Sequence, residues 1–120
     1  MVNTGALKAS ITSAAGLTLG EDRTVRFVVK DSAGVNVSDF TGWTFGWYLL
    51  PRQNMATNDP DVLLTKTSAS GISATAPNVD VSLDPVDTDD LSARTYFYEL
   101  WRTDAADVVR LAYGPIVFID

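Results

Sequence analysis

Aspartates form the densest group of metal-ligating side chains in the sequence, four of them within seven residues: Asp84, Asp87, Asp89 and Asp90. Carboxylates gathered in this way can bind a calcium ion. The stretch lacks the glycine and the terminal glutamate of an EF-hand loop, and aspartate is also the usual residue of caps and turns. We therefore interpret residues 84 to 92 as a connection with about one turn of helix. We expect no metal ion and no cofactor.

A hydrolase with two catalytic carboxylates would need them roughly 5 to 9 Å apart. Glu21 and Glu99 are the only glutamates, and nothing in the sequence brings them together. Asp39 and Asp80 could take the same role, but charged side chains are mostly exposed and solvated. The carboxylates therefore favour polar surface over catalysis.

Histidine and cysteine are both absent. This excludes Ser-His-Asp and Cys-His catalysis and the usual zinc sites. No serine stands three residues before a lysine, and the glycines do not cluster into a phosphate-binding loop. The sequence therefore predicts a protein that is not an enzyme and has no small-molecule substrate.

Aromatic side chains could stack on a sugar or on bases. They gather in two stretches and comprise Trp43, Trp47, Tyr48, Tyr96, Phe97, Tyr98 and Trp101. In a small β-sandwich most such rings must fill the core. Tyr48, Phe97 and Trp101 are the exceptions, because the alternation of the sequence places them opposite the core.

The stretch that must position these rings is Gly42 to Pro51, the richest in apolar and aromatic residues. Alternate residues from Trp43 to Leu49 are large and apolar, which is the period of a strand with one heavily buried face. Residues Thr95 to Arg102 repeat the pattern, with Tyr96, Tyr98 and Leu100 on the inner face. Two aromatic strands therefore anchor the predicted core.

Further strands are predicted from alternation at Ala6–Ser13, Arg23–Lys30, Val62–Thr67, Asn78–Leu83, Val108–Tyr113 and Ile116–Ile119. Gly114 and Pro115 are expected to bend the chain between the last two. The ten residues from Arg52 to Asp61 form a long polar loop, which is a candidate contact surface. Short strands separated by turns are typical of a β-sandwich, here of about seven to eight strands. The length of 120 residues fits a single domain over residues 6–120, preceded by a flexible arm at residues 1–5.

The formal net charge is -6. Such a surface repels nucleic acid and anionic membranes, so we expect neither as a partner. No apolar run has the length of a signal-peptide core or of a membrane span. We expect a soluble chain that is made in the cytoplasm.

Both faces of several strands are apolar, which a two-layer sandwich does not require. The sequence leaves two explanations open. Connecting loops cover the second face, or that face is a protein-protein interface. In the second case the interface residues would be Tyr48, Phe97, Trp101, Ile116 and Phe118.

Four segments in this order resemble the immunoglobulin-like domain of tailed-bacteriophage virion proteins, including the N-terminal domain of baseplate upper proteins: Gly20–Gly34, Phe40–Trp43, Val79–Leu91 and Thr95–Leu100. The similarity covers most of the chain from about Leu17 onward. Arg94 departs from the family pattern, which tends to have glycine before Thr-Tyr. Tyr96 is similar to the tyrosine of the corner found in immunoglobulin-like folds.

The resemblance implies an immunoglobulin-like antiparallel β-sandwich that serves as a non-enzymatic structural protein of a phage virion. Its partners would be capsid, tail or baseplate subunits, or a second copy of the chain, and its final location the virion. Because no receptor-binding part follows the domain, the resemblance favours capsid decoration or an accessory role at the tail or baseplate. The alternative is a host-surface or glycan-binding module of a phage particle.

Overall fold

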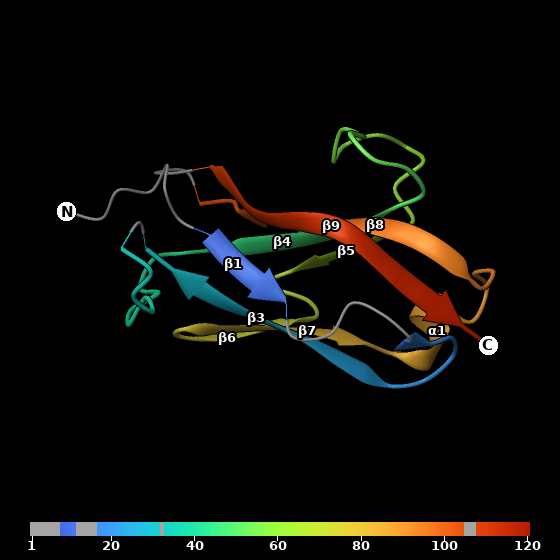
Figure 1. Cartoon of the computed structure of the whole chain (residues 1–120), viewed down its shortest axis with the longest axis horizontal. Coiled ribbons are helices and arrows are strands. Elements are labelled where there is room, and N and C mark those ends of the chain that lie inside the picture. Colours follow the sequence, from blue (N-terminus) through green and yellow to red (C-terminus); the bar gives the residue numbers. More distant parts are fainter. Residues whose placement is uncertain (1–7, 12–16, 32, 105–107) are drawn as a thin grey trace.

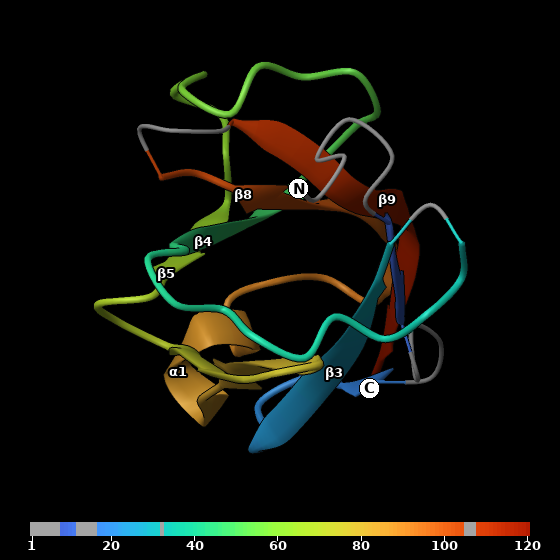
Figure 2. The same ribbon diagram turned by 90° about the vertical axis from the view of Figure 1, so that its left-hand side faces the viewer.

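Two β-sheets face each other and enclose the core in the computed structural model (Figure 1). The structure describes residues 8–11, 17–31, 33–104 and 108–120. Figure 2 shows the two layers nearly end-on, with the short helix α1 beside the lower layer. The predicted arm, Met1 to Gly5, lies outside the described residues.

The first sheet has four strands in the order β1 (Lys8–Ile11), β3 (Arg23–Lys30), β7 (Asn78–Leu83) and β6 (Ile72–Thr75). All of its neighbouring strands run antiparallel. β3 and β7 alternate between buried apolar residues and exposed or half-buried residues, most of which are polar. This alternation sets the register, because a shift of one residue would expose the whole apolar side of each strand.

The second sheet has the order β2 (Leu17–Thr18), β9 (Val109–Ile119), β8 (Arg94–Arg102), β4 (Phe45–Leu50) and β5 (Leu64–Thr67). Its pairings are antiparallel except that of β2 with β9, which is parallel. β4 and β8 are the two aromatic strands that the sequence predicts as anchors, and they pair directly.

The strand order is that of an immunoglobulin-like sandwich. In the first sheet, the neighbouring strands β1, β3, β7 and β6 occupy the places of strands A, B, E and D. In the second sheet, β4, β8 and β9 occupy those of C, F and G. β5 extends the second sheet beside β4. The prediction of an all-β sandwich is confirmed.

The core contains an aromatic pair where antibody domains carry a disulfide between strands B and F. Phe27 of β3 and Tyr98 of β8 face each other across the two sheets, with ring centroids 5.6 Å apart. Trp47 of β4 is fully buried in the same core. Tyr98 is also buried, and this burial raises the pKa of its phenol. Apolar packing alone therefore joins the sheets at this position.

The end of the sandwich between β7 and β8 is closed by α1 (Pro85–Thr88) and a tyrosine corner. The Asp84 backbone N–H donates to the Asp87 carboxylate at 2.7 Å, which caps the helix start. Tyr96 Oη donates to the Ser92 carbonyl at 2.9 Å, which is the corner that the resemblance implies. The interpretation of this stretch as about one turn of helix agrees with the structure.

Trp43, which the sequence places in the central strand, instead precedes β4 and packs on the edge of the core. The Arg102 guanidinium lies 4.0 Å from the centroid of its ring. Arg102 also donates to the Asp104 carboxylate at 2.7 and 3.0 Å. These hydrogen bonds are the main reason why the pKa of Asp104 lies below its ordinary value.

The expected bend at Gly114 and Pro115 is wrong, because β9 runs without interruption from Val109 to Ile119. Proline lacks an N–H donor but is tolerated where the strand does not need that hydrogen bond. The irregularity instead lies at Leu111, where a bulge shifts the register between β8 and β9. Among the described residues, no helix is long and apolar enough to span a membrane.

Candidate functional site

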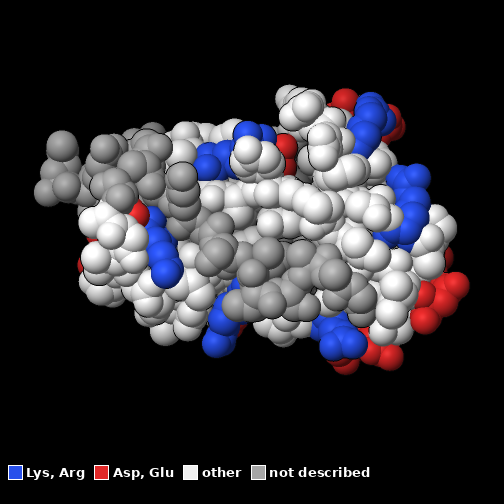
Figure 3. Space-filling model, in the orientation of Figure 1, with Lys and Arg blue, Asp and Glu red and all other residues white. Residues whose placement is uncertain are grey.

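Apolar side chains line the outward side of the five-stranded sheet. Cross-strand partners in a sheet point to the same side, and the register aligns Phe97 with Pro115, Glu99 with Tyr113, and Tyr48 with Glu99. We call this surface the outer apolar face and define it by Tyr48, Phe97, Trp101, Tyr113, Pro115, Val117 and Ile119. Figure 3 shows mostly uncharged surface along the course of β9.

The structure divides the five residues that the sequence predicts for an interface. Tyr48, Phe97 and Trp101 lie on the outward side and are half-buried, so their role at an interface stays a prediction. Ile116 and Phe118 lie in the core, with 0% and 2% of their surface exposed. They present no surface to a partner, and the prediction for these two residues is wrong.

The outward residues of β9 were missed because the sequence was divided at Gly114 and Pro115. In a continuous strand, the odd-numbered residues from Tyr113 to Ile119 point outward. Tyr113 is 66% exposed and Ile119 is 44% exposed. Reading the whole stretch at a period of two would have identified them.

Glu99 is a buried carboxylate on the outward side of β8, and 6% of its surface is exposed. Its Oε1 accepts a hydrogen bond from Trp101 Nε1 at 2.9 Å. Its Oε2 accepts one from Arg110 at 3.3 Å. A buried carboxylate requires such partners, because an unpaired charge away from water is costly.

Arg110 reaches Glu99 from the neighbouring strand β9 and stacks on an aromatic ring. Its guanidinium lies 4.0 Å from the centroid of the Tyr113 ring. This geometry is a cation–π contact, which fixes the orientation of both side chains. The bulge at Leu111 makes the arrangement possible, since it aligns Arg110 with Trp101 while Tyr113 remains opposite Glu99.

The β4–β5 loop (residues 51–63) folds over the outer side of the five-stranded sheet (Figure 2). Met55 anchors it and is almost fully buried. Asn54 has a φ of 59°, the left-handed conformation that asparagine tolerates better than most residues. The first explanation for the apolar second face therefore holds in part, because the loop covers some of that face. The outward side of β9 is left exposed, and its role as an interface stays a prediction.

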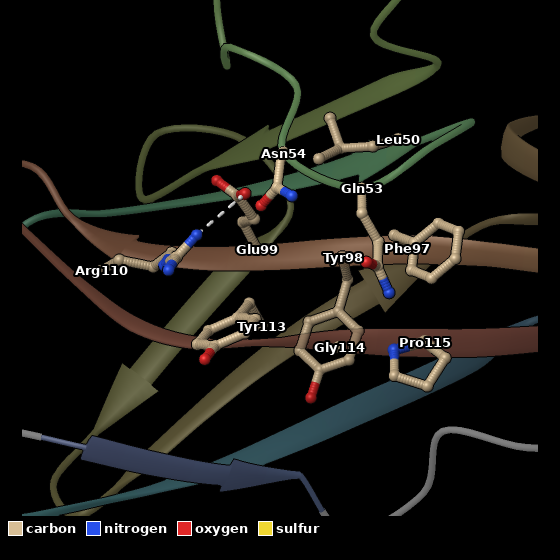
Figure 4. A pocket seen from close by; sticks show the side chains of 10 residues that line it. All are labelled: Leu50, Gln53, Asn54, Phe97, Tyr98, Glu99, Arg110, Tyr113, Gly114 and Pro115. Carbon is tan, nitrogen blue, oxygen red and sulfur yellow. Dashed lines mark hydrogen bonds and ion pairs between the residues drawn. The ribbon is translucent and has the colours of Figure 1, made fainter.

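A cavity of about 280 Å³ lies between the loop and the sheet, and we call it the loop cleft. Figure 4 shows Gln53 and Asn54 reaching from the loop toward Phe97 and Glu99. Arg110 and Tyr113 line the same cavity from β9. A second, more open hollow of about 650 Å³ adjoins it and shares Asn54, Glu99 and Arg110. Trp101 lines this second hollow.

In the acidic stretch that the sequence offers as a calcium site, the Asp87 carboxylate makes structural contacts. Asp87 Oδ2 accepts hydrogen bonds from Lys66 Nζ and from the Asp84 N–H, both at 2.7 Å. Both side chains of the Lys66–Asp87 ion pair are largely buried. Within the described part of the chain, no group of three or more acidic residues is placed to hold a metal ion.

The remaining carboxylates take separate partners rather than forming a catalytic pair. Glu21 forms an ion pair with Arg23, and Asp80 forms one with Arg26. Asp39 accepts hydrogen bonds from the hydroxyl and the backbone N–H of Thr41, which lower its pKa. Among the described contacts, none joins Glu21 to Glu99.

The candidate site is thus a surface with two parts, the loop cleft and the exposed apolar side chains of β9. The loop cleft offers charged and amide groups between aromatic rings, and the outward side of β9 offers an apolar contact area. Aromatic and arginine side chains of this kind are enriched where proteins bind partners. No protein-family model matches the chain, and no curated protein matches it.

Proposed function

We propose that the chain is a non-enzymatic structural protein of a tailed-phage virion that binds other virion subunits. The resemblance of its sequence to immunoglobulin-like virion domains suggests the setting. The observation that carries the proposal is the outer apolar face, above all the exposed outward residues of β9 from Tyr113 to Ile119. In this role the chain would decorate the capsid or serve as an accessory of the tail or baseplate.

Contiguous apolar surface on a soluble protein usually marks an interaction site. Phe97 and Pro115 form a cross-strand pair at the middle of the outer apolar face, and Tyr113 lies one pair along. A central group of aromatic side chains is where binding energy concentrates in protein interfaces. The partner would be a protein, because the net charge of -6 opposes binding to nucleic acid.

The proposal can be tested by adding the tagged chain to purified particles of its phage that lack it. We expect it to cosediment with the particles. Val117→Glu, which places a charge among the outward residues of β9, should reduce cosedimentation by about tenfold or more. Thr24→Glu is the matched control, because Thr24 is an exposed outward residue of β3 in the opposite sheet. It should bind as the wild type does.

Two outcomes would overturn the proposal: the wild type does not cosediment with the particles, or the two variants bind equally well. If Val117→Glu lowers the unfolding midpoint so far that loss of binding reflects loss of fold, Val117→Thr, which keeps the β-branched shape but adds a hydroxyl, takes its place with the same expected loss of binding. Sedimentation of the chain alone separates binding to virion subunits from association with a second copy.

The loop cleft favours a second candidate function, a host-surface or glycan-binding module of a phage particle. Aromatic rings beside amide and charged side chains are the groups that hold polar ligands in a pocket. Gln53, Asn54 and Tyr113 provide this combination at one opening. Retention of the purified chain on host cells or on a glycan array tests this candidate directly.

A further inference from the structure

Glu99 has more hydrogen-bonding capacity than its partners use. A carboxylate has roughly four acceptor positions on its two oxygens. Trp101 Nε1 uses one position on Oε1, and Arg110 uses one on Oε2 through a long contact of 3.3 Å. The side chain lines both the loop cleft and the adjoining hollow. A ligand hydroxyl in the cleft could therefore donate to Glu99.

Arg110 places donors beside this acceptor. The guanidinium has five N–H groups, and 36% of the side chain is exposed. Its Cζ lies 4.0 Å from the centroid of the Tyr113 ring, and this cation–π contact holds the group beside Glu99. Glu99 and Arg110 together carry no net charge but present an acceptor and donors next to each other.

The walls of the cleft add amides and aromatic surface. Gln53 and Asn54 reach into it from the loop (Figure 4). Tyr113 is on the sheet side of the loop cleft, and Trp101 is in the adjoining hollow. The cavity volume of about 280 Å³ is near the lower end of the range for ligand pockets, which is roughly 300 to 1,000 Å³. A cavity of this volume suits a ligand the size of a single six-membered ring.

We propose that the loop cleft binds a neutral hexose unit of a glycan. Neighbouring hydroxyls of the sugar would donate to Glu99 and accept from Arg110, while its C–H face would pack on Tyr113. This inference rests on the second candidate function and names the ligand class and the residues of that site. A further sugar unit could continue toward Trp101 in the adjoining hollow.

The charges of the site and the strand topology favour a neutral sugar over an acidic sugar, a cation or an extended peptide. An acidic sugar would meet the buried charge of Glu99 and a chain of net charge -6. A cationic ligand would be repelled by the positive charge of Arg110. An extended peptide binds best by adding a strand to a sheet edge, but the cleft lies over β8 and β9, and β8 has both of its edges paired. Side-chain donors and acceptors on a sheet face suit alcohol groups better.

The indole N–H signals of a ¹⁵N-labelled full-length chain provide a direct test. The chain has three tryptophans, and the Trp101 indole donates to Glu99 inside the site, whereas Trp47 is in the core. The probes are the methyl glycosides of glucose, galactose and mannose and their short neutral oligomers, added to millimolar concentration. We expect at least one probe to move the Trp101 signal and to leave the Trp47 signal in place. Trp101→Phe assigns the first signal.

Two variants locate the binding site. Tyr113→Ala removes an exposed ring, and Glu99→Gln keeps the shape of the side chain but removes its charge. Each should weaken binding of the selected glycoside by about tenfold or more. Thr24→Glu is the control, because Thr24 is an exposed outward residue of β3 in the opposite sheet. It should leave glycoside binding unchanged.

The inference is overturned when no neutral glycoside moves the Trp101 signal, when only sialylated or uronic acid glycans do, or when Tyr113→Ala and Glu99→Gln bind as the wild type does. It is also overturned when these variants abolish binding to virion subunits while no sugar binds. The second candidate function can survive such a failure, since a chain that binds host cells equally well after Tyr113→Ala is a host-binding module with a different site.

Discussion

The outward surfaces of the two sheets differ in chemistry although both sheets enclose the same core. On the four-stranded sheet, the outward side of β3 and β7 is largely polar, and Arg26 of β3 pairs with Asp80 of β7 at 2.8 Å. On the five-stranded sheet, the outward residues of β9 are apolar, and the charged pair Glu99–Arg110 lies beneath a loop. The first surface resembles an ordinary solvated face of an antiparallel sheet.

This difference distinguishes the side chains that the fold requires from those that it does not require. The inner sides of both sheets contribute large buried residues, such as Phe27 from one sheet and Trp47 from the other. The sandwich requires these contacts, but it does not require Tyr113 or Ile119 to be apolar and exposed. The asymmetry of the outward surfaces is therefore the best guide to where the molecule binds.

The largest expected effect concerns the shared core. Trp47→Ala should lower the free energy of unfolding by about 3 to 5 kcal/mol, because it leaves a cavity between the sheets. Trp47→Phe should cost clearly less, since Trp47 Nε1 has no hydrogen-bond partner among the described residues. Urea unfolding followed by fluorescence and circular dichroism measures both. Equal losses for the two variants would show that the indole nitrogen matters and contradict this account.

The second prediction concerns the nearly buried ion pair at the end of β8. Asp104→Asn should lower the free energy of unfolding by about 2 kcal/mol at neutral pH, because Arg102 loses a charged partner with two hydrogen bonds. The folded state lowers the pKa of Asp104. Its stabilisation is therefore complete above the unfolded value of about 3.9 and is lost as the pH falls through the folded value.

The difference between the wild type and Asp104→Asn should accordingly shrink from pH 7 to pH 2 in urea titrations. A difference that stays constant over this range would contradict the role of the Asp104 charge. Thr103→Ser, a neighbouring change that keeps a hydroxyl and both charges, is the matched control and should show the wild-type dependence on pH.

The third prediction concerns the corner before β8. Tyr96→Phe removes the hydrogen bond to the Ser92 carbonyl and should cost about 1 to 2 kcal/mol. The ring itself remains packed against Phe118. Thermal unfolding measures the loss, and Ser92→Ala is informative beside it because the carbonyl acceptor belongs to the backbone. A larger loss for Ser92→Ala than for Tyr96→Phe would indicate that the corner is not the stabilising contact.

The fourth prediction compares two neighbours in β4. Tyr48→Ala should cost only about 1 kcal/mol, because its ring lies on the outward side over Gly46 rather than in the core. It should nevertheless weaken binding to particles. If Tyr48→Ala unfolds the domain as severely as Trp47→Ala, the interface role of Tyr48 is wrong. Chemical denaturation and particle cosedimentation together distinguish the outcomes.

The smallest effect is expected on the opposite surface. Asp80→Asn removes the exposed ion pair with Arg26 and should leave the unfolding midpoint within experimental error, because solvent screens such pairs. It should not alter binding to particles or to glycosides. Loss of binding in this variant would show that both outward surfaces contribute and would remove the contrast between them.

Much of the fold could be predicted from local patterns. β3 was predicted with its observed bounds, and β8 to within one residue, because the alternation in each is uninterrupted. The turn of helix at α1 was also predicted, since proline and aspartate favour a helix start. The small residues from Ile72 to Pro77 do not indicate one type of structure, and part of this segment forms the edge strand β6.

The candidate site was harder to predict because it depends on contacts between distant segments. Glu99 and Arg110 meet only after the bulge at Leu111 sets the register of β8 and β9. The fold of the β4–β5 loop over the sheet gave no local signal apart from the isolated Met55, which is buried. The outward residues of β9 were accessible to sequence reasoning, but the glycine and proline inside the strand obscured the alternation.

The parallel pairing of β2 with β9 has a consequence for the response to mechanical force. Leu17 and Thr18 lie beside Phe118 and Ile119, and the Leu19 N–H donates to the Ile119 carbonyl at 2.9 Å. Pulling the two ends of the chain apart would drag these parallel strands past each other in opposite directions. Their hydrogen bonds would then be loaded together in shear rather than opened one by one. A domain pulled by its ends would therefore resist stretching at this pairing of β2 with β9.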